Sequence, residues 1–155
     1  MATPLLYYDR LPSTVLMKDK SIGPLQDAQR AVQLIRTAYP DLSQVGVIGF
    51  SAGGHLASTL ITKFDKNYID NPHGISLRPD FAGLIYPVIS MKDGVTHQGS
   101  KTHLLGADAS EKKISDFSSN LQVSDRICPA FLVHAKDDQT VPIENSYLMQ
   151  AALNR

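Results

Sequence analysis

A short apolar run that breaks at glycines around one serine restricts the possible folds of this chain more than any other feature. Residues 45–50 are almost wholly apolar, and helix-forming residues follow as far as Ala57. Between them Gly49, Ser51 and Gly53 stand in the pattern G-x-S-x-G. This pattern is typical of a strand, a sharp turn and a helix, with the serine at the strained turn. We therefore expect a parallel sheet with the Ser51 hydroxyl held above the end of one strand.

The chemistry open to such a serine is attack on a carbonyl group. A hydroxyl raised on a sharp turn can reach a substrate carbonyl, and the amide N–H of Ala52, which opens the helix, can donate to the oxyanion that forms. The alternative is a glycine-rich turn that only joins a strand to a helix. Because a strand precedes the motif and a helix follows it, we favour Ser51 as a nucleophile and Ala52 as an oxyanion donor.

Apolar runs alternate with helical patterns along the chain. The runs lie at residues 45–50, 81–86 and 130–135, and residues 5–8 are expected to form a further short strand. Pro24 stands at the favoured first position of a helix whose apolar residues recur every three or four positions. Strand and helix in alternation predict a three-layer α/β/α domain with about four mainly parallel strands. Ligands of such sheets bind at the carboxyl ends of the strands.

Length and charge narrow the class of protein. With 155 residues, 43% of them hydrophobic, the chain can form one domain with a real core, and we assign residues 1–155 to a single domain. Fifteen basic residues balance fifteen acidic ones, so we expect neither nucleic acid nor a membrane as a partner. A small neutral substrate fits this balance better.

The single cysteine and the lack of a recognisable targeting signal bear on the location of the protein in the cell. Cys128 is the only cysteine, which excludes an internal disulfide and a cysteine-based metal site. We expect it to be a buried spacer. No run approaches the length of a membrane span, and the residues after Met1 lack the pattern of a signal peptide. The expectation is a cytoplasmic protein.

A second stretch, residues 131–142, places carboxylates directly after a predicted strand. A serine hydroxyl becomes a strong nucleophile when a histidine takes its proton and a carboxylate orients that histidine. Asp137 or Asp138 could be this carboxylate. The alternative for both is an exposed turn aspartate before the helix that begins near Pro142. We favour the turn role for Asp137 and the catalytic role for Asp138.

Three segments together resemble the α/β-hydrolase superfamily, in particular its acetyl-esterase and acetylxylan-esterase-like branch. They are G-F-S-A-G-G-H-L-A from Gly49, P-L-Q-D-A-Q-R-A from Pro24 and H-A-K-D-D-Q-T-V-P from His134, and the resemblance extends from about Leu5 onward. In that branch the acid is the aspartate of H-x-x-x-D-x-x-V-P, which is Asp138 here. The resemblance implies a serine carboxylesterase for small acyl esters, acetyl esters first, with acetylated carbohydrates as one candidate, and implies no metal or organic cofactor.

The chain departs from that branch in two features: the histidine that acts as the base, and the second donor of the oxyanion hole. Relatives carry an H-G-G-G-type loop and a histidine beyond the helix after the acid, and neither is found here. His55 and His134 are expected to pack in the interior, whereas His97 and His103 follow a strand end and share the rim with the serine. The chain thus resembles the middle of a hydrolase, a partial domain with an incomplete triad.

Two further expectations follow from this resemblance to the middle part of a hydrolase. Relatives add strands on both sides of the sheet, so its edges would be unpaired, and we expect a homo-oligomer that forms through these exposed edges. The alternative to an esterase is a catalytically silent hydrolase fragment that acts as a folded or assembling module.

Overall fold

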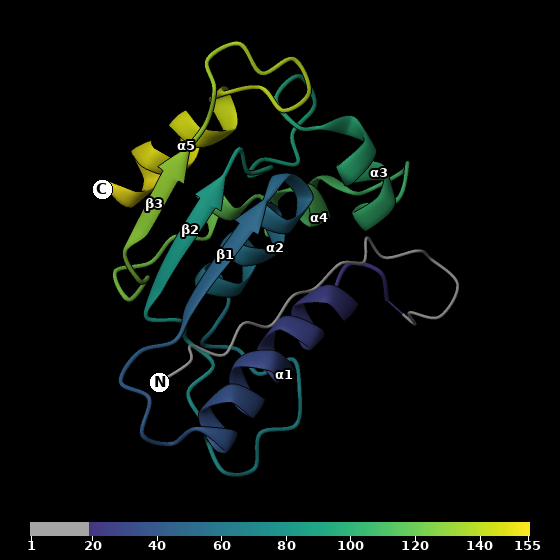
Figure 1. The fold of residues 1–155 in the computed structure, drawn as a ribbon. Helices are drawn as coiled ribbons and strands as arrows, with labels where there is room; N and C mark the ends of the chain where they lie inside the picture. The colour runs from purple at the N-terminus through teal and green to yellow at the C-terminus, as the bar shows by residue number, and fades with distance from the viewer. Residues whose placement is uncertain (1–18) are drawn as a thin grey trace.

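The structure, a computed structural model, describes residues 19–155 as an α/β fold (Figure 1). Its elements in chain order are α1 (Gly23–Ala38), β1 (Gly46–Phe50), α2 (Ser51–Thr62), β2 (Phe81–Ile85), α3 (Gln98–Leu105), α4 (Glu111–Asp116), the 3-10 turn η1 (Ser119–Leu121), β3 (Ala130–Val133) and α5 (Glu144–Leu153). Each of the three later predicted strands and each of the predicted helices has a counterpart in this order.

The sheet has three parallel strands in the order β1-β2-β3. Val47 of β1 lies beside Ala82 of β2, and Leu84 of β2 lies beside Leu132 of β3. The predicted α/β class and parallel sheet are confirmed. About four strands were expected; three lie within residues 19–155, and the fourth, predicted at residues 5–8, lies outside the described part of the chain.

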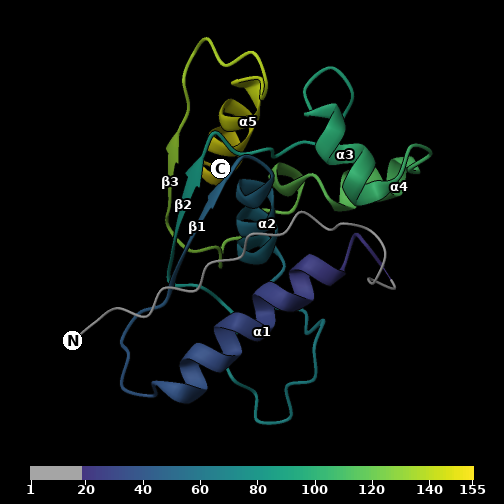
Figure 2. The same ribbon diagram turned by 45° about the vertical axis from the view of Figure 1, so that its right-hand side comes forward.

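One face of the sheet is covered by helices and holds the core. Figure 2 shows the sheet almost edge-on, with the helices all on one side of it. Helix α2 packs on β1 and β2, and α1 packs mainly on α2, in a cluster that also includes Val47 of β1. Ile61, Leu84, Ile89 and Met149 are fully buried between these layers. This packing brings α2, and so the serine that opens it, into a rigid position at the centre of the molecule.

The opposite face of the sheet is bare among residues 19–155. Because side chains alternate along a strand, this face carries every second residue, and its exposed apolar members are Ile48, Phe50, Phe81, Phe131 and Val133. Phe131 is 70% exposed and Ile48 is 64% exposed. The prediction of helices on both faces therefore needs a correction for this part of the chain, because every helix between residues 19 and 155 packs on the same side. We call this surface the bare face.

Helix boundaries follow local signals. Pro24 stands in the first turn of α1, as expected for a residue that lacks an N–H and has a fixed φ. Leu25 and Val32 form the stripe that α1 presents to Leu60 of α2. None of the helices within residues 19–155 combines the length and apolar character needed to cross a membrane.

Candidate active site

Ser51 occupies a strained turn between β1 and α2. Its φ is 51°, a left-handed value that residues with a side chain rarely adopt. The turn is possible because its neighbours are small. A Cβ on Gly49 would collide with the carbonyl oxygen of Gly53, and a Cβ on Gly54 would lie 2.7 Å from the Cβ of Pro87. The local geometry is therefore that of the predicted strand, sharp turn and helix, which we call the nucleophile elbow, with the serine at the carboxyl end of β1.

The loop after β2, residues 86–97, supports the turn at Ser51. We call this segment the β2 loop. The amide of Val88 donates to the carbonyl oxygen of Ser51 over 3.1 Å. Tyr86 opens the loop with a φ of 36°, and its ring stands 6.0 Å from that of Phe50 at a tilt of 60°. Strained residues of this kind cluster at functional sites. The sequence did not indicate this one, because the residue before Pro87 is expected to be extended.

The amino-terminal turn of α2 offers hydrogen-bond donors at the same place. Phe50, at the N-cap position, makes no side-chain capping bond, and the first amides of a helix have no partner within it. Ala52, half-buried, supplies one of these amides. The positive end of the helix dipole adds to their attraction for an anion. The predicted oxyanion donor thus lies directly beside the serine.

Asp138 lies in the loop after β3, residues 134–143, called here the acid loop. Its Oδ1 accepts hydrogen bonds from the backbone amides of Val141 over 2.9 Å and Thr140 over 2.8 Å. These two bonds lower the pKa of the Asp138 carboxyl below its usual range. The group is consequently ionised at neutral pH. Asp137 is exposed in the same loop.

His134 is held in place on both sides of its ring. Its Nε2 lies 2.8 Å from the carbonyl oxygen of Val141, and its Nδ1 lies 2.8 Å from Ser146 Oγ. Since a carbonyl oxygen can only accept, Nε2 carries the proton, and in the neutral ring Nδ1 accepts from the serine hydroxyl. Asp138 Oδ2 is 3.5 Å from Nε2, and the His134 side chain is only 2% exposed. His134 has the packed, hydrogen-bonded role that the sequence indicated.

The other predicted interior histidine, His55, is also packed. It is 5% exposed and its Nε2 lies 2.8 Å from the carbonyl oxygen of Phe117. Burial lowers the pKa of His55 to about 4, so the ring is neutral at physiological pH. It serves to hold α2 against the segment after α4.

Neither rim candidate for the base, His97 or His103, hydrogen-bonds to the serine within residues 19–155. His97 caps α3 by accepting from the amide of Ser100 over 3.3 Å, and its Nδ1 lies 2.9 Å from Ser100 Oγ. His103 is exposed on α3. Between residues 19 and 155, no histidine hydrogen-bonds to the Ser51 hydroxyl. The segment after the strand end contains helix α3, where His97 caps the helix and His103 faces solvent.

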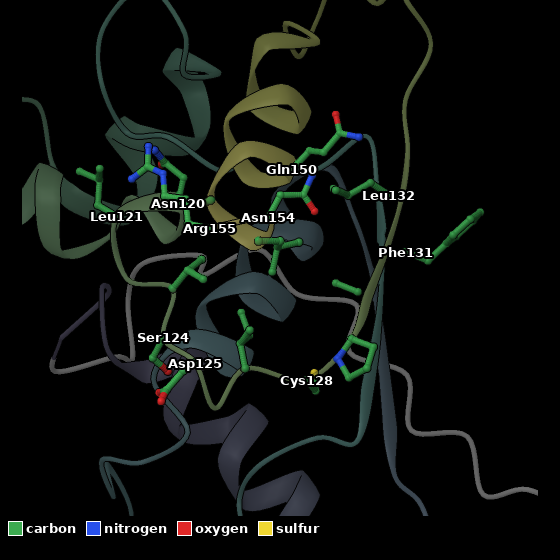
Figure 3. A pocket seen from close by; sticks show the side chains of 16 residues that line it. Asn120, Leu121, Ser124, Asp125, Cys128, Phe131, Leu132, Gln150, Asn154 and Arg155 are labelled. Atoms are coloured by element: carbon green, nitrogen blue, oxygen red, sulfur yellow. The ribbon is translucent and has the colours of Figure 1, made fainter.

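The structure also has a hollow away from the serine. A groove of about 1000 Å³ runs between β3, the segment before it and the last turn of α5 (Figure 3). Its walls include Leu121, Cys128, Leu132 and Asn154, and Cys128 is buried and unpaired, as predicted. The groove follows the free edge of β3 toward its amino-terminal end, whereas Ser51 lies at the carboxyl ends. It is not the place where the serine would meet a substrate.

Comparison with known sequences and structures gives consistent matches. The BD-FAE family matches the chain over residues 17–153. The chain is 40% identical over 136 residues to endo-1,4-beta-xylanase B of Butyrivibrio fibrisolvens, which covers 84% of this chain and 21% of that protein. It is 33% identical over 132 residues to an acetylxylan esterase of Xylanibacter ruminicola, covering 81% and 25% respectively.

A solved structure agrees with these sequence matches. The acetyl ester-xyloside bifunctional hydrolase from Caldicellulosiruptor lactoaceticus superposes with a TM-score of 0.77 at 44% identity, over 84% of this chain and 50% of that one. The chain therefore spans a quarter or less of the two curated relatives and half of the solved relative.

Proposed function

The chain belongs to the BD-FAE family of α/β-hydrolases, and on this premise we propose that it carries the nucleophile and the acid of a serine carboxylesterase. The substrates proposed are small neutral acyl esters, acetyl esters first, and acetylated carbohydrates are the leading candidates. The names of the esterase relatives support this choice. The observation that carries it is the position of Ser51, a strained residue between β1 and α2 at the carboxyl edge of a parallel sheet.

In this mechanism each named residue has one task. Ser51 Oγ forms a bond to the acyl carbon, and the amide of Ala52 donates to the oxygen that becomes negative. In a complete triad the serine proton would pass to a histidine imidazole, which would return it to the leaving alcohol, and water would release the acyl group by the same route in reverse. None of the histidines between residues 19 and 155 hydrogen-bonds to the Ser51 hydroxyl. Ionised Asp138 would orient such an imidazole, because Oδ1 is fixed by two amides and leaves Oδ2 to accept its N–H. The triad formed by residues 19–155 is incomplete, so slow turnover is expected.

Labelling of the serine tests this proposal. Incubation with a fluorophosphonate probe, followed by peptide mass spectrometry, should place the adduct on Ser51, and Ser51→Ala should abolish it. Ser43→Ala, at an exposed serine outside the site, is the matched control and should leave labelling unchanged. An adduct only on another serine rejects the assignment. Absence of any adduct favours the second candidate below.

The second candidate is a catalytically silent module that assembles with a copy of itself, and the bare face is the observation that favours it. The exposed side chains of this face together present on the order of 600 Å² of apolar surface, the upper end for a monomer. The sheet residues on this face are uncharged, and the chain has no net charge to oppose association. Two such faces buried together reach the ~1,200 Å² at which stable interfaces begin. The proposed homo-oligomer therefore joins copies through this face as well as through the strand edges.

A further inference from the structure

Asn145, in the first turn of α5, is a fully buried polar residue whose side chain uses all its hydrogen-bonding capacity. Its Oδ1 accepts from the amides of Ile89 over 2.9 Å and Ser90 over 3.0 Å. Its Nδ2 donates to the carbonyl oxygens of Val95 over 2.7 Å and Pro142 over 3.0 Å. An amide has two donor hydrogens and an oxygen that accepts twice. The pocket therefore matches asparagine atom for atom, and no hydrophobic residue of similar volume could replace these bonds.

The four partners of Asn145 belong to the two loops that carry the proposed chemistry. Three lie in the β2 loop, where the neighbouring Val88 holds the carbonyl oxygen of Ser51. The fourth, Pro142, belongs to the acid loop, next to Val141, whose amide holds the carboxylate of Asp138. One side chain thus joins the loop under the nucleophile to the loop that shapes the acid.

Ser146, next to Asn145, also contacts the acid loop. Ser146 Oγ lies 2.8 Å from His134 Nδ1, and the other nitrogen of that ring bonds to the acid loop. Both residues stand in the first turn of α5, while the later residues Met149 and Ala152 attach the helix to the core. The start of α5 is therefore specialised for holding loops, and the rest of the helix for packing.

From this arrangement we infer that Asn145 is a positioning residue, which fixes the acid loop relative to the nucleophile elbow. This inference rests on the proposed function for its catalytic meaning. An imidazole can bridge a serine and a carboxylate only when their separation is held to a fraction of an ångström, and small displacements cost much of the rate. Asn145 supplies that constraint between Ser51 and Asp138 without touching the reacting atoms.

The first test measures the connection that Asn145 makes between the β2 loop and the acid loop, and it needs no catalytic activity. In Asn145→Leu, the Asp138 carboxyl, titrated by carbon NMR, should show a pKa raised back toward its ordinary value, because the amides of the acid loop no longer hold it. The amides of Ile89 and Ser90 should exchange with solvent about tenfold faster or more. Gln150→Ala, at an exposed position of the same helix, should change neither.

The reciprocal variant keeps the test decisive if Asn145→Leu fails to fold. Coupling between two sites must act in both directions, so Asp138→Ala, at the rim, should also speed the exchange of the Ile89 and Ser90 amides. Asp137→Ala is its matched control and should not. If Asp138→Ala leaves those amides unchanged, or if Asn145→Leu frees them while the Asp138 pKa stays low, Asn145 is only a local tie and the inference is overturned.

The second test measures the consequence for chemistry. The rate of phosphonylation of Ser51 should fall about 10- to 100-fold in Asn145→Leu, with the adduct still on the same residue. An unchanged rate beside a raised Asp138 pKa overturns the positioning role. A chain that shows no phosphonylation at all counts against the proposed function, and the exchange and titration results still decide whether Asn145 joins the two loops.

Discussion

The two faces of the sheet are alike in sequence and opposite in environment. The covered face carries Val47, Leu84 and Leu132, and the bare face carries Ile48, Phe50 and Phe131. Both sets are apolar, as expected for parallel strands that are to be buried on both sides. The difference shows that residue type alone does not determine burial. What covers a strand is decided by elements distant in sequence, and residues 19–155 place all of theirs on one side.

The largest effect should be on the rate of hydrolysis and should come from Ser51, which lies at the edge of the sheet and on neither face. Ser51→Ala should reduce the slow hydrolysis of p-nitrophenyl acetate to background, because Ser51 Oγ is the atom proposed to take the acyl group. Ile48→Lys, on the bare face, should leave the Ser51-dependent rate per site unchanged. Initial rates at matched protein concentration measure both. A rate that survives Ser51→Ala would assign the hydrolysis to other groups of the surface.

The covered face should respond strongly to truncation. Leu84 is fully buried in β2, the central strand, so Leu84→Ala should lower the free energy of unfolding by about 2–5 kcal/mol. Ile48→Ala, which removes a similar side chain from the bare face, should cost less than about 1 kcal/mol. Urea denaturation followed by circular dichroism measures both. Equal losses would mean that the bare face is covered in solution as tightly as the core.

Association should respond to charge on the bare face. Light scattering coupled to size exclusion should show an assembly for the unsubstituted chain and a 16.9 kDa monomer for Phe131→Lys, because each copy would otherwise bury an unpaired ammonium group. Leu34→Lys places the same charge on α1 at a residue that is 58% exposed, and should leave the assembly intact. A monomer at every concentration of the unsubstituted chain contradicts the homo-oligomer.

The smallest effect should be the pH dependence of the free energy of unfolding that Asp138 contributes. The pKa of Asp138 is lowered in the folded chain by the amides of Val141 and Thr140, so folding favours its ionised form. This contribution is present above the ordinary value of 3.8 and is lost as the pH falls through the lowered value. The unfolding free energies of the unsubstituted chain and Asp138→Ala should therefore converge in acid. Parallel curves for Asp138→Ala would contradict the assignment.

The elements predicted best from sequence are those built by neighbours in the chain. The elbow was predicted from Gly49, Ser51 and Gly53. The structure shows the steric demand at Gly49, whereas a Cβ on Gly53 would meet nothing within 4 Å and the second demand falls on Gly54, beside Pro87. The strand at residues 130–135 and the helix after Pro142 were also placed correctly within two residues. Local sequence is sufficient wherever one turn decides the backbone.

The features that escaped prediction depend on distant contacts. Asn145 finds its partners in Ile89 and Ser90, about 55 residues away, and nothing in the local pattern marks it. Tyr86, whose φ is positive, donates its amide to Val133 of β3 and places its ring near Phe50. The bare face arises because the helices within residues 19–155 all take the same side. Such features depend on how the elements pack, which periodicity does not specify.

The left-handed backbone at Ser51 bears on whether this chain retains a chemical role. A residue with a Cβ is less stable there than glycine by about 1–2 kcal/mol, of which the greater freedom of glycine in the unfolded chain returns a part. Ser51→Gly should thus yield a protein at least as stable and without a nucleophile. Serine at this position therefore costs the fold a small amount of stability. The proposed role of Ser51 as a nucleophile accounts for this cost, since strained residues cluster at functional sites.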